Sequence, residues 1–267
     1  MGLIRKTMTK VQREGMASVL SSLRDKLERM GHRSVQSLLM GRVVTTRGIT
    51  LDLQNARVSR RMKTELARGT YELEEIEAIE SYLSSESDVI ELGGCIGYTA
   101  CYTNKILKKG ARHVVVEPNS ALEPVLQHNR RLNGCDYEIY CAAYSSDQGP
   151  ITIDIPENIW GASLVRDERD SVTVDAVDLE WLMEKFDISQ FTLIADIEGA
   201  EVDLIDNELD VLEAHCELLI IEFHHRKDEY SHIAAEIESA RAKLDDSSFT
   251  CLVRKNSGVS VYRNEML

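Results

Sequence analysis

The chain has 267 residues, of which 43% are hydrophobic, so it can fold around a core and is not a disordered chain. Its 31 basic and 45 acidic side chains give a net charge of −14, but the charge is divided unevenly. Residues 1–70 carry 15 basic and 5 acidic side chains, a net of +10, whereas residues 71–267 carry 16 and 40, a net of −24. Because attraction to phosphates supplies most non-specific affinity for nucleic acid, the acidic body excludes bulk binding of nucleic acid.

The sequence has no apolar run of about 18 residues and no signal-peptide pattern at its start, so we expect neither a membrane span nor export. None of its six cysteines belongs to a C-x-x-C pair, and most lie in apolar runs. This pattern predicts free thiols in a reducing compartment and hence a cytoplasmic protein. The cysteines are Cys95, Cys101, Cys135, Cys141, Cys216 and Cys251.

The basic N-terminal part has a pattern of its own. Apolar residues recur every three or four positions over residues 11–30, which predicts an amphipathic helix. We therefore predict a basic helical extension over residues 1–47 and a second domain over residues 48–267. Two roles stay open for the extension: docking on the acidic body of its own chain or of a second subunit in a homo-oligomer, or peripheral contact with an anionic membrane surface.

After the extension, helices and strands are predicted in quick succession. Residues 49–53 form a short strand candidate, Ser59 is placed to cap a helix through residue 67, and Thr70 to cap one over residues 71–83. Apolar strands are then predicted at residues 88–92, 113–117, 137–143, 191–197 and 218–223. Helices are predicted at residues 98–109, 121–132, 178–185, 200–213 and 229–244.

Strands with near-continuous apolar character, separated by helices, indicate a parallel sheet that is covered on both faces. Residues 151–155 and 172–174 alternate apolar and polar side chains instead, as an inserted excursion would. Residues 250–254 and 259–263 flank an Asn-Ser-Gly sequence at 256–258, which is a hairpin signal. The predicted fold is α/β: a Rossmann-like, doubly wound sheet, mostly parallel, that ends in an antiparallel hairpin.

The first predicted strand leads into a glycine-rich loop before a helix, and glycines let a backbone turn tightly and approach a ligand. The loop holds Gly93, Gly94 and Gly97, with Glu91 two residues before the first glycine. The spacing is not the G-x-G-x-x-G of dinucleotide enzymes, and an acid at this place would repel pyrophosphate. The loop therefore favours a cationic ligand, such as an ammonium or a sulfonium.

The second strand ends in an acid, Glu117, which lies 20 residues after Gly97. That separation fits one helix and one strand. In nucleoside-binding sheets a carboxylate at this position accepts hydrogen bonds from both ribose hydroxyls.

These motifs resemble those of class I S-adenosylmethionine-dependent methyltransferases and, more narrowly, of the FkbM family. The narrower resemblance is carried by Asp196-Ile-Glu198-Gly-Ala-Glu201, by Leu219-Ile-Ile-Glu222-Phe-His224 and by Gly69-Thr-Tyr71-Glu72. It covers residues 48–224, roughly two-thirds of the chain. The sequence departs from the family at Glu91, where aspartate is more frequent, and at Gly94, where alanine is.

The resemblance implies S-adenosylmethionine as cofactor, a seven-stranded sheet and a role for each matching residue. The three loop glycines would admit the methionine part of the cofactor beside Glu91, and Glu117 would hold its ribose. Asn119 would flank the adenine, and Ala142 and Ala143 would leave room for its edge. Asp196 ends a predicted strand at the crevice where open α/β sheets bind ligands, so it is a candidate for binding the cofactor as well.

The acceptor side carries the second group of candidate residues. Asp196, Glu198 and His224 are the catalytic candidates, and His224 is a candidate general base because its unperturbed pKa is about 6.5. Trp160, Ser163 and Glu222 are candidates for binding the acceptor. Glu201 suits capping of the next helix better than catalysis. Asp196, Glu198, Glu222 and His224 offer ligands for a divalent ion, but their spacing matches no fixed metal motif, so we expect transfer without a metal.

The expected function is O-methylation of a hydroxyl on a sugar, glycan or polyketide-like metabolite, with a small-molecule or glycan acceptor and no nucleic-acid partner. The preference for oxygen comes from the resemblance. The alternatives are a small-molecule N-methyltransferase, a nicotinamide-dependent oxidoreductase on the same type of sheet, and a non-catalytic protein that keeps the nucleoside pocket. The missing G-x-G-x-x-G argues against the oxidoreductase.

Overall fold

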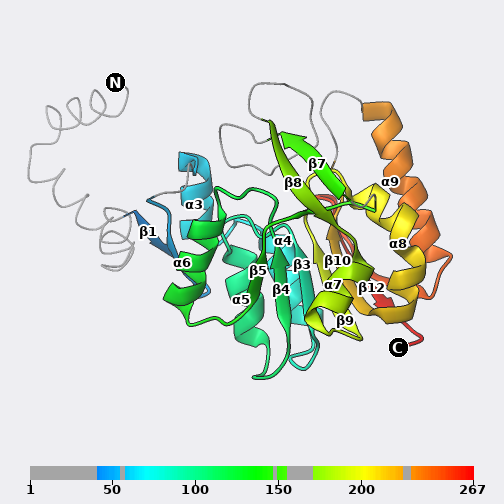
Figure 1. Ribbon diagram of the computed structural model, residues 1–267, viewed down its shortest axis with the longest axis horizontal. Helices are drawn as coiled ribbons and strands as arrows, with labels where there is room; N and C mark the ends of the chain where they lie inside the picture. The colour runs from blue at the N-terminus through cyan, green and yellow to red at the C-terminus, as the bar shows by residue number, and fades with distance from the viewer. Residues whose placement is uncertain (1–40, 55–57, 147–148, 155–170, 225–229) are drawn as a thin grey trace, which may run out of the picture.

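The structure is a computed structural model and describes residues 41–54, 58–146, 149–154, 171–224 and 230–267 (Figure 1). The predicted helix over residues 11–30 lies outside the described residues. Within the described ranges no helix has both the length and the apolar content needed to cross a bilayer. All six cysteines are free thiols, as predicted.

The centre of the molecule is a seven-stranded sheet with the order β11-β12-β10-β9-β3-β4-β5. Only β12 runs opposite to the other six strands, so the mostly parallel sheet with a terminal hairpin is confirmed. Its strands are β3 (Val89–Leu92), β4 (His113–Val116), β5 (Glu138–Tyr140), β9 (Phe191–Ala195), β10 (Cys216–Glu222), β11 (Phe249–Arg254) and β12 (Val259–Asn264).

Helices cover both faces of this sheet (Figure 1). One face carries α4 (Leu73–Tyr82), α5 (Tyr98–Ile106) and α6 (Glu123–Asn133), and the other carries α7 (Leu179–Phe186), α8 (Glu201–His215) and α9 (Tyr230–Asp245). Successive side chains of a strand point to opposite faces, so Leu193 packs in one apolar cluster and Ile194 in the other. Burial on both faces explains the near-continuous apolar character of these strands.

The two predicted caps before the sheet have different outcomes. Ser59 caps α3 (Arg60–Arg68) as predicted, since its hydroxyl accepts a hydrogen bond from the Met62 amide at 3.1 Å. The predicted cap at Thr70 is wrong. The Thr70 amide donates to the Glu65 carbonyl at 2.9 Å, so this residue closes the end of α3 instead. The following helix, α4, begins at Leu73 after Glu72, and no side chain caps it.

A short hairpin precedes α3, and its first strand was not predicted. β1 (Arg42–Val44) pairs antiparallel with β2 (Thr50–Asp52). The β2 backbone is held by α6, because the amide of Asp52 donates to Asn129 Oδ1 at 2.8 Å. The predicted boundary between residues 47 and 48 therefore falls inside a hairpin that packs on the body.

A three-stranded sheet with the order β6-β8-β7 forms the predicted excursion. It consists of β6 (Ala143–Tyr144), β7 (Gly149–Asp154) and β8 (Ser171–Val177). The single strand predicted over residues 137–143 is wrong, because the chain changes sheets there. The Tyr140 carbonyl still accepts from the Glu117 amide in the main sheet, whereas the Ser145 amide donates to Val177 in the small one. Ala142 and Ala143 therefore lie at the junction of the two sheets.

Candidate functional site

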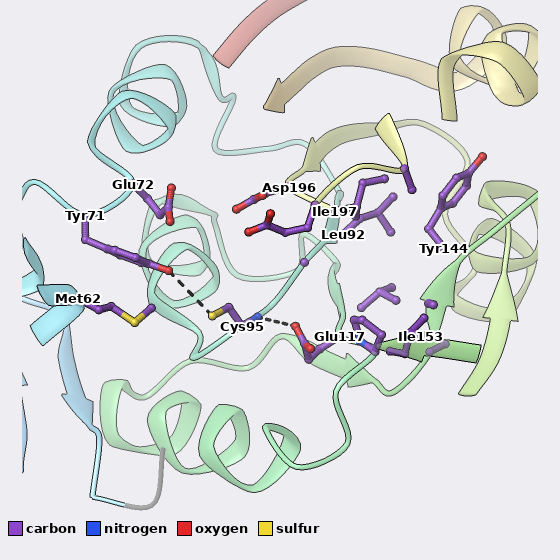
Figure 2. Close-up of a pocket in the computed structure, with 17 residues that line it drawn as sticks. Met62, Tyr71, Glu72, Leu92, Cys95, Glu117, Tyr144, Ile153, Asp196 and Ile197 are labelled. Carbon is purple, nitrogen blue, oxygen red and sulfur yellow. Dashed lines mark hydrogen bonds between the residues drawn. The ribbon is translucent and has the colours of Figure 1, made fainter. Parts of the chain in front are cut away.

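A pocket opens at the carboxyl ends of the central strands (Figure 2). β3 lies between β4 and β9, so the chain order reverses at this point, which is where open α/β sheets bind ligands. The space in the pocket and its open mouth is about 880 Å³. Its lining comes from the glycine loop, from the ends of β4 and β9, from the small sheet and from the segment before α4.

The glycine loop fixes the floor of the pocket by close packing. Gly93 lines the pocket with φ +101°, and a Cβ on it would lie 1.9 Å from the Asp196 carbonyl oxygen. Gly94 packs on Val115, where a Cβ would meet Cγ1 at 2.6 Å, and Gly97 begins α5 with φ +79°. The Gly93 and Gly94 amides both donate to the Val116 carbonyl. The loop therefore contributes shape to the pocket, since these amides already have partners.

Glu117 presents a rigid carboxylate to the pocket from the end of β4. Its Oε1 accepts from the Asn119 amide at 2.8 Å and its Oε2 from the Cys95 amide at 2.7 Å, the second of which Figure 2 shows. Burial raises the pKa of Glu117 to about 7, although these two hydrogen bonds lower it. Each carboxylate oxygen can accept a further hydrogen bond, so the group fits a diol.

Small residues border the same side of the pocket. Ala142 and Ala143 line it, together with Tyr144 and with Ile153 from β7. The side chain of Asn119, in contrast, does not line the pocket. Its Oδ1 accepts from the Ala121 amide at 3.1 Å and so stabilises the turn before α6.

Glu91 also lies away from the pocket. Leu92 lines the pocket, and the preceding side chain of a strand points to the opposite face of the sheet. Glu91 is only 1% exposed, and its Oε2 lies 3.1 Å from His113 Nε2. Burial raises the pKa of Glu91. Its carboxylate pairs with the buried His113 beneath the loop. This pairing accounts for an acid before the glycines, and no cationic ligand is needed to explain it.

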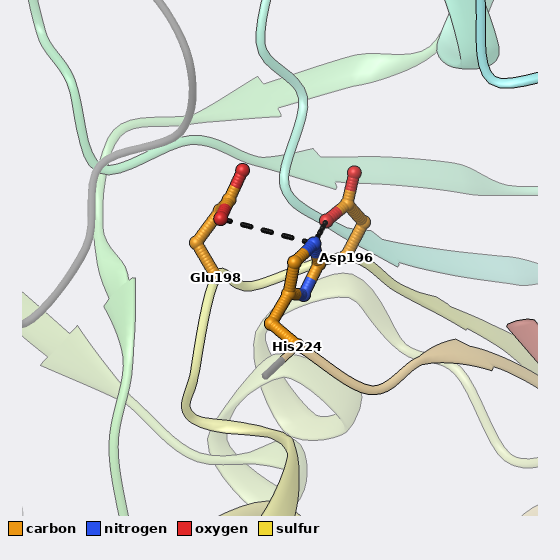
Figure 3. A group of neighbouring side chains, drawn as sticks. All are labelled: Asp196, Glu198 and His224. Atoms are coloured by element: carbon orange, nitrogen blue, oxygen red, sulfur yellow. Dashed lines mark ion pairs between the residues drawn. The ribbon is translucent and has the colours of Figure 1, made fainter. Parts of the chain in front are cut away.

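The other end of the pocket is acidic, because Glu72, Asp196 and Glu198 line it. His224 lies behind this lining, at the centre of an acidic group that it forms with Asp196, Glu198 and Glu222 (Figure 3). Its Nε2 lies 3.5 Å from Asp196 Oδ1, 3.7 Å from Glu198 Oε2 and 4.0 Å from Glu222 Oε1. Asp196 follows β9, Glu222 ends β10, and His224 comes two residues later. The fold thus brings together Asp196, Glu198, Glu222 and His224, which sequence reasoning had grouped.

Glu201 is a residue of this group whose role sequence reasoning missed. It is 2% exposed, and its Oε1 accepts from the Gly199 amide at 3.1 Å and lies 2.9 Å from His224 Nδ1. Its carboxylate therefore orients the imidazole as well as starting α8. The sequence showed only an acid in the first turn of the predicted helix over residues 200–213, which capping of that helix already explained.

Glu72 is the second missed residue. It lines the pocket from the segment before α4, with φ 46°, next to Tyr71, whose hydroxyl lies 4.0 Å from Cys95 Sγ. One oxygen of its carboxylate lies within 4.8 Å of ligand atoms of Asp196 and Glu222. Its only signal in the sequence was the family motif at residues 69–72.

Crowding of these carboxylates changes their acidity. Burial, followed by repulsion from neighbouring acids, raises the pKa of Asp196 to about 8 although His224 lowers it. Burial likewise raises the pKa values of Glu72 and Glu222 to about 7. The crowded site therefore favours a bound cation, or protonation of some of the acids, over negative charges on all of them.

His224 does not have the pKa expected of it. Burial lowers the pKa of His224, but the hydrogen bond to Glu201 and the charges of Asp196 and Glu198 raise it to about 11. These neighbours therefore favour the protonated imidazole, and that form cannot accept a proton. The reason given for His224 as general base, an unperturbed pKa, does not hold here.

Two acceptor-binding candidates, Trp160 and Ser163, lie outside the described residues. The remaining geometry fits a nucleoside with a charged tail. The Gly93 position leaves no room for a side chain at the floor, Glu117 offers a carboxylate for a diol, and the alanines leave space beside it. The seven-stranded sheet with one antiparallel strand is also what the resemblance to class I S-adenosylmethionine-dependent methyltransferases implied.

The family follows from the sequence. A model of the methyltransferase FkbM domain matches residues 91–244, more than half of the chain. The chain belongs to the FkbM methyltransferase family, and S-adenosylmethionine is its methyl donor. No protein among those with curated descriptions matches it significantly.

Several solved structures are similar to the chain. One is an O-methyltransferase from Bacillus cereus in complex with SAH, with 12% identity, 70% of this chain and 76% of that chain covered, and a TM-score of 0.43. Another is a putative rRNA-methylase from Clostridium thermocellum, with 7% identity, coverage of 71% and 93%, and a TM-score of 0.47. A third is a putative tRNA (m1A22) methyltransferase from Streptococcus pneumoniae in complex with S-adenosyl-L-methionine, with 13% identity, coverage of 72% and 72%, and a TM-score of 0.40.

Proposed function

We propose that this methyltransferase transfers the methyl group of S-adenosylmethionine to a hydroxyl on a sugar, glycan or polyketide-like metabolite. The observation that carries the proposal is the acidic group around His224, which adjoins the cofactor pocket through Asp196 and Glu198. A hydroxyl is a weak nucleophile until its proton is removed, and a cluster of carboxylates beside the methyl group can accept that proton.

The cofactor half of the pocket has a defined role in this proposal. The glycine loop, with Gly93, Gly94 and Gly97, admits the methionine part of S-adenosylmethionine. The Glu117 carboxylate accepts hydrogen bonds from the ribose hydroxyls. Ala142 and Ala143 leave room for the adenine. For Glu91 and Asn119 we propose indirect roles, because Glu91 pairs with His113 under the loop and Asn119 fixes the turn that follows Glu117.

The chemical step is a displacement. The acceptor oxygen forms a bond to the methyl carbon, the bond between that carbon and the sulfonium sulfur breaks, and S-adenosylhomocysteine leaves as a neutral thioether. The hydroxyl proton passes to an ionised carboxylate of the acidic group, for which Asp196 and Glu198 are our candidates. Their raised pKa values make each a stronger base than an ordinary carboxylate when it is ionised. His224 holds these carboxylates in place as a cation, and the protein contributes mainly the alignment of oxygen, carbon and sulfur.

The acceptor would lie on the far side of the acidic group. Glu222, which ends β10, is a member of this group, and we propose that it binds an acceptor hydroxyl. Trp160 and Ser163 would add an aromatic wall and a hydrogen-bonding group, because aromatic faces pack well on the carbons of sugars.

An acceptor screen tests the proposal. The full-length protein is incubated with labelled S-adenosylmethionine and matched acceptors that carry either a hydroxyl or an amine at the same position. We expect label on the hydroxyl compounds and S-adenosylhomocysteine in equal amount. Label only on the amines would replace the proposal with N-methylation, which the acidic group also suits because it attracts cations.

The cellular setting is part of the proposal. Six free thiols support a cytoplasmic location. We propose that the basic extension docks on the acidic body of its own chain or of a second subunit, with an anionic membrane surface as the alternative. Co-sedimentation with anionic vesicles, compared between the full chain and a version without residues 1–40, separates the two.

A further inference from the structure

We propose that Asp196, Glu198 and His224 bind a divalent metal ion at the acceptor end of the pocket; its suggested role rests on the proposed function, but its existence does not. One carboxylate oxygen from each acid and a ring nitrogen of His224 lie within 4.8 Å of one another. Atoms at such separations can contact one ion placed between them, since metal–oxygen and metal–nitrogen bonds are about 2.0–2.6 Å long.

A second group of three residues shares Asp196. One oxygen each from Glu72, Asp196 and Glu222 also lie within 4.8 Å of one another. Within the described ranges these two groups are the ones that bring three potential ligands together. The two groups share Asp196, which is therefore the residue common to both candidate sites.

The orientation of His224 is independent support. Its Nδ1 lies 2.9 Å from Glu201 Oε1, which leaves Nε2 directed toward Asp196 and Glu198. Histidine coordinates a metal as the neutral imidazole, so an ion bound here replaces the Nε2 proton that the acids hold in the metal-free protein. Metal-binding histidines usually donate their second N–H to a carboxylate in this way, because the contact fixes the tautomer and the plane of the ring. Glu201 is itself 2% exposed and held by the Gly199 amide, so the support is rigid.

Asp196 supplies a further observation. Its Oδ1 is buried and has no hydrogen-bond partner among the described residues, although the charged ring of His224 is 3.5 Å away. A buried carboxylate oxygen is costly without a partner, and hydrogen-bond partners are the rule for such atoms. A metal ion among Asp196, Glu198 and His224 would satisfy this oxygen and offset the repulsion between the acids.

The ligand set favours a particular kind of ion. Carboxylate oxygens suit Mg²⁺ and Mn²⁺, and one imidazole nitrogen favours Mn²⁺ of the two. An ion at this place would bind the acceptor hydroxyl and hold its oxygen beside the methyl group. The expectation of a metal-free site came from spacing along the chain, but the ligands come from the ends of β9 and β10, whose separation in sequence follows no fixed pattern.

Binding of Mn²⁺ to the full-length protein tests the site without any measurement of activity. The protein is treated with chelator, dialysed and titrated with MnCl₂, and free Mn²⁺ is followed by electron paramagnetic resonance. We expect one ion per chain. Asp196→Asn and His224→Gln should lose it, and Glu201→Gln should weaken it by about 10- to 100-fold, as is usual for the outer partner of a metal-binding histidine. Glu184→Gln, on the exposed surface of α7, is the matched control and should bind as the wild type does.

Two controls make each outcome decisive. Thermal unfolding checks that each variant is folded. If a variant is unfolded, Glu198→Gln takes its place, because the Glu198 side chain lies on a loop, is 33% exposed and can be replaced without disturbing the core. Binding of S-adenosylhomocysteine is measured in the same samples. Absence of bound Mn²⁺, or equal binding by wild type and all variants, overturns the metal site. If S-adenosylhomocysteine still binds in that case, the proposed function stands, whereas loss of both would remove it too.

Discussion

The two ends of the pocket differ in whether their polar groups already have hydrogen-bond partners in the protein. At the β3–β4 end, the Gly93 amide and both oxygens of Glu117 have backbone partners, so this end is rigid and complete before a ligand arrives. At the β9–β10 end, carboxylates crowd around one imidazole, and Asp196 Oδ1 lacks a hydrogen-bond partner. The comparison teaches that the first end suits one ligand of defined shape. The acids of the second end remain ready to bind a cation or to accept a proton.

The largest expected effect is at the acidic end. Asp196→Asn should lower turnover by about 100- to 10,000-fold, because proton removal by a placed group contributes about that much. The dissociation constant of S-adenosylhomocysteine should change by less than about threefold, which is small beside any such loss. Single-turnover kinetics and calorimetric titration measure the two. Normal turnover in Asp196→Asn would mean that the crevice is wrongly assigned.

The next effect concerns the floor of the cofactor end. Gly93→Ala should destabilise the fold by more than about 3 kcal/mol, because it combines a positive φ with a clash against the Asp196 carbonyl. Gly110→Ala is the matched control, with φ +107° and no atom within 4 Å of the added Cβ. It should cost about 1–3 kcal/mol for the backbone alone. Denaturant unfolding measures both free energies of unfolding. An equal decrease in Gly93→Ala and Gly110→Ala would show that Gly93 does not pack tightly against the Asp196 carbonyl.

Replacing the ribose carboxylate should give a smaller loss. Glu117→Gln should weaken S-adenosylhomocysteine by about 10- to 100-fold, since a hydrogen bond to a charged group contributes about 1.5–3 kcal/mol. Turnover at saturating cofactor should stay close to the wild-type rate, because Glu117 lies at the end remote from the acids. A large fall in turnover with unchanged affinity would place Glu117 in the chemistry instead.

The same carboxylate predicts a pH dependence of binding. Burial raises the pKa of Glu117 to about 7, above its ordinary value of 4.5. The protonated form is therefore favoured in the folded protein, whose stability from this group is full below about pH 4.5 and is lost as the pH rises through about 7. Ribose hydroxyls require the ionised form, so cofactor affinity should fall as the pH drops from 8 to 6, by up to about tenfold per unit below 7. Calorimetry at several pH values checks this slope, which should disappear in Glu117→Gln.

The smallest expected effect tests the proposed role of Trp160 in binding the acceptor. Trp160→Ala should raise the KM of the acceptor by about tenfold, consistent with loss of an aromatic contact of about 1 kcal/mol or more. The dissociation constant of the cofactor should not change. Steady-state kinetics with each substrate varied in turn gives both values, and equal effects on the two would remove Trp160 from the acceptor wall.

Much of the fold was readable from the sequence, because strands buried on both faces require continuous apolar runs. The Leu193 and Ile194 side chains, which are neighbours in β9, pack in two different apolar clusters. The division at Cys141 was not readable, since the apolar run continues while the chain changes from β5 to β6. β1 was missed because three residues stabilised by pairing with β2 leave no periodic pattern.

Sequence patterns predicted the site residues that follow the end of a strand. They did not predict the residues whose role depends on contacts between distant parts of the chain. Glu117 and Asp196 occupy the expected places at the ends of β4 and β9. Glu91 was placed toward the ligand although strand alternation with Leu92 turns it to the other face. Glu72 and Glu201 gain their roles only from a loop and a helix start that fold back on His224 and Asp196, contacts that spacing along the chain does not encode.

A crystal structure of the full chain with S-adenosylhomocysteine tests the division of the pocket most directly. The ribose should lie on the Glu117 carboxylate, with the adenine beside Ala142 and Ala143 and the thioether sulfur facing Asp196 and Glu198. A ligand bound with its ribose at the acidic end, or away from Gly93, would contradict the assignment of a cofactor end and a reaction end.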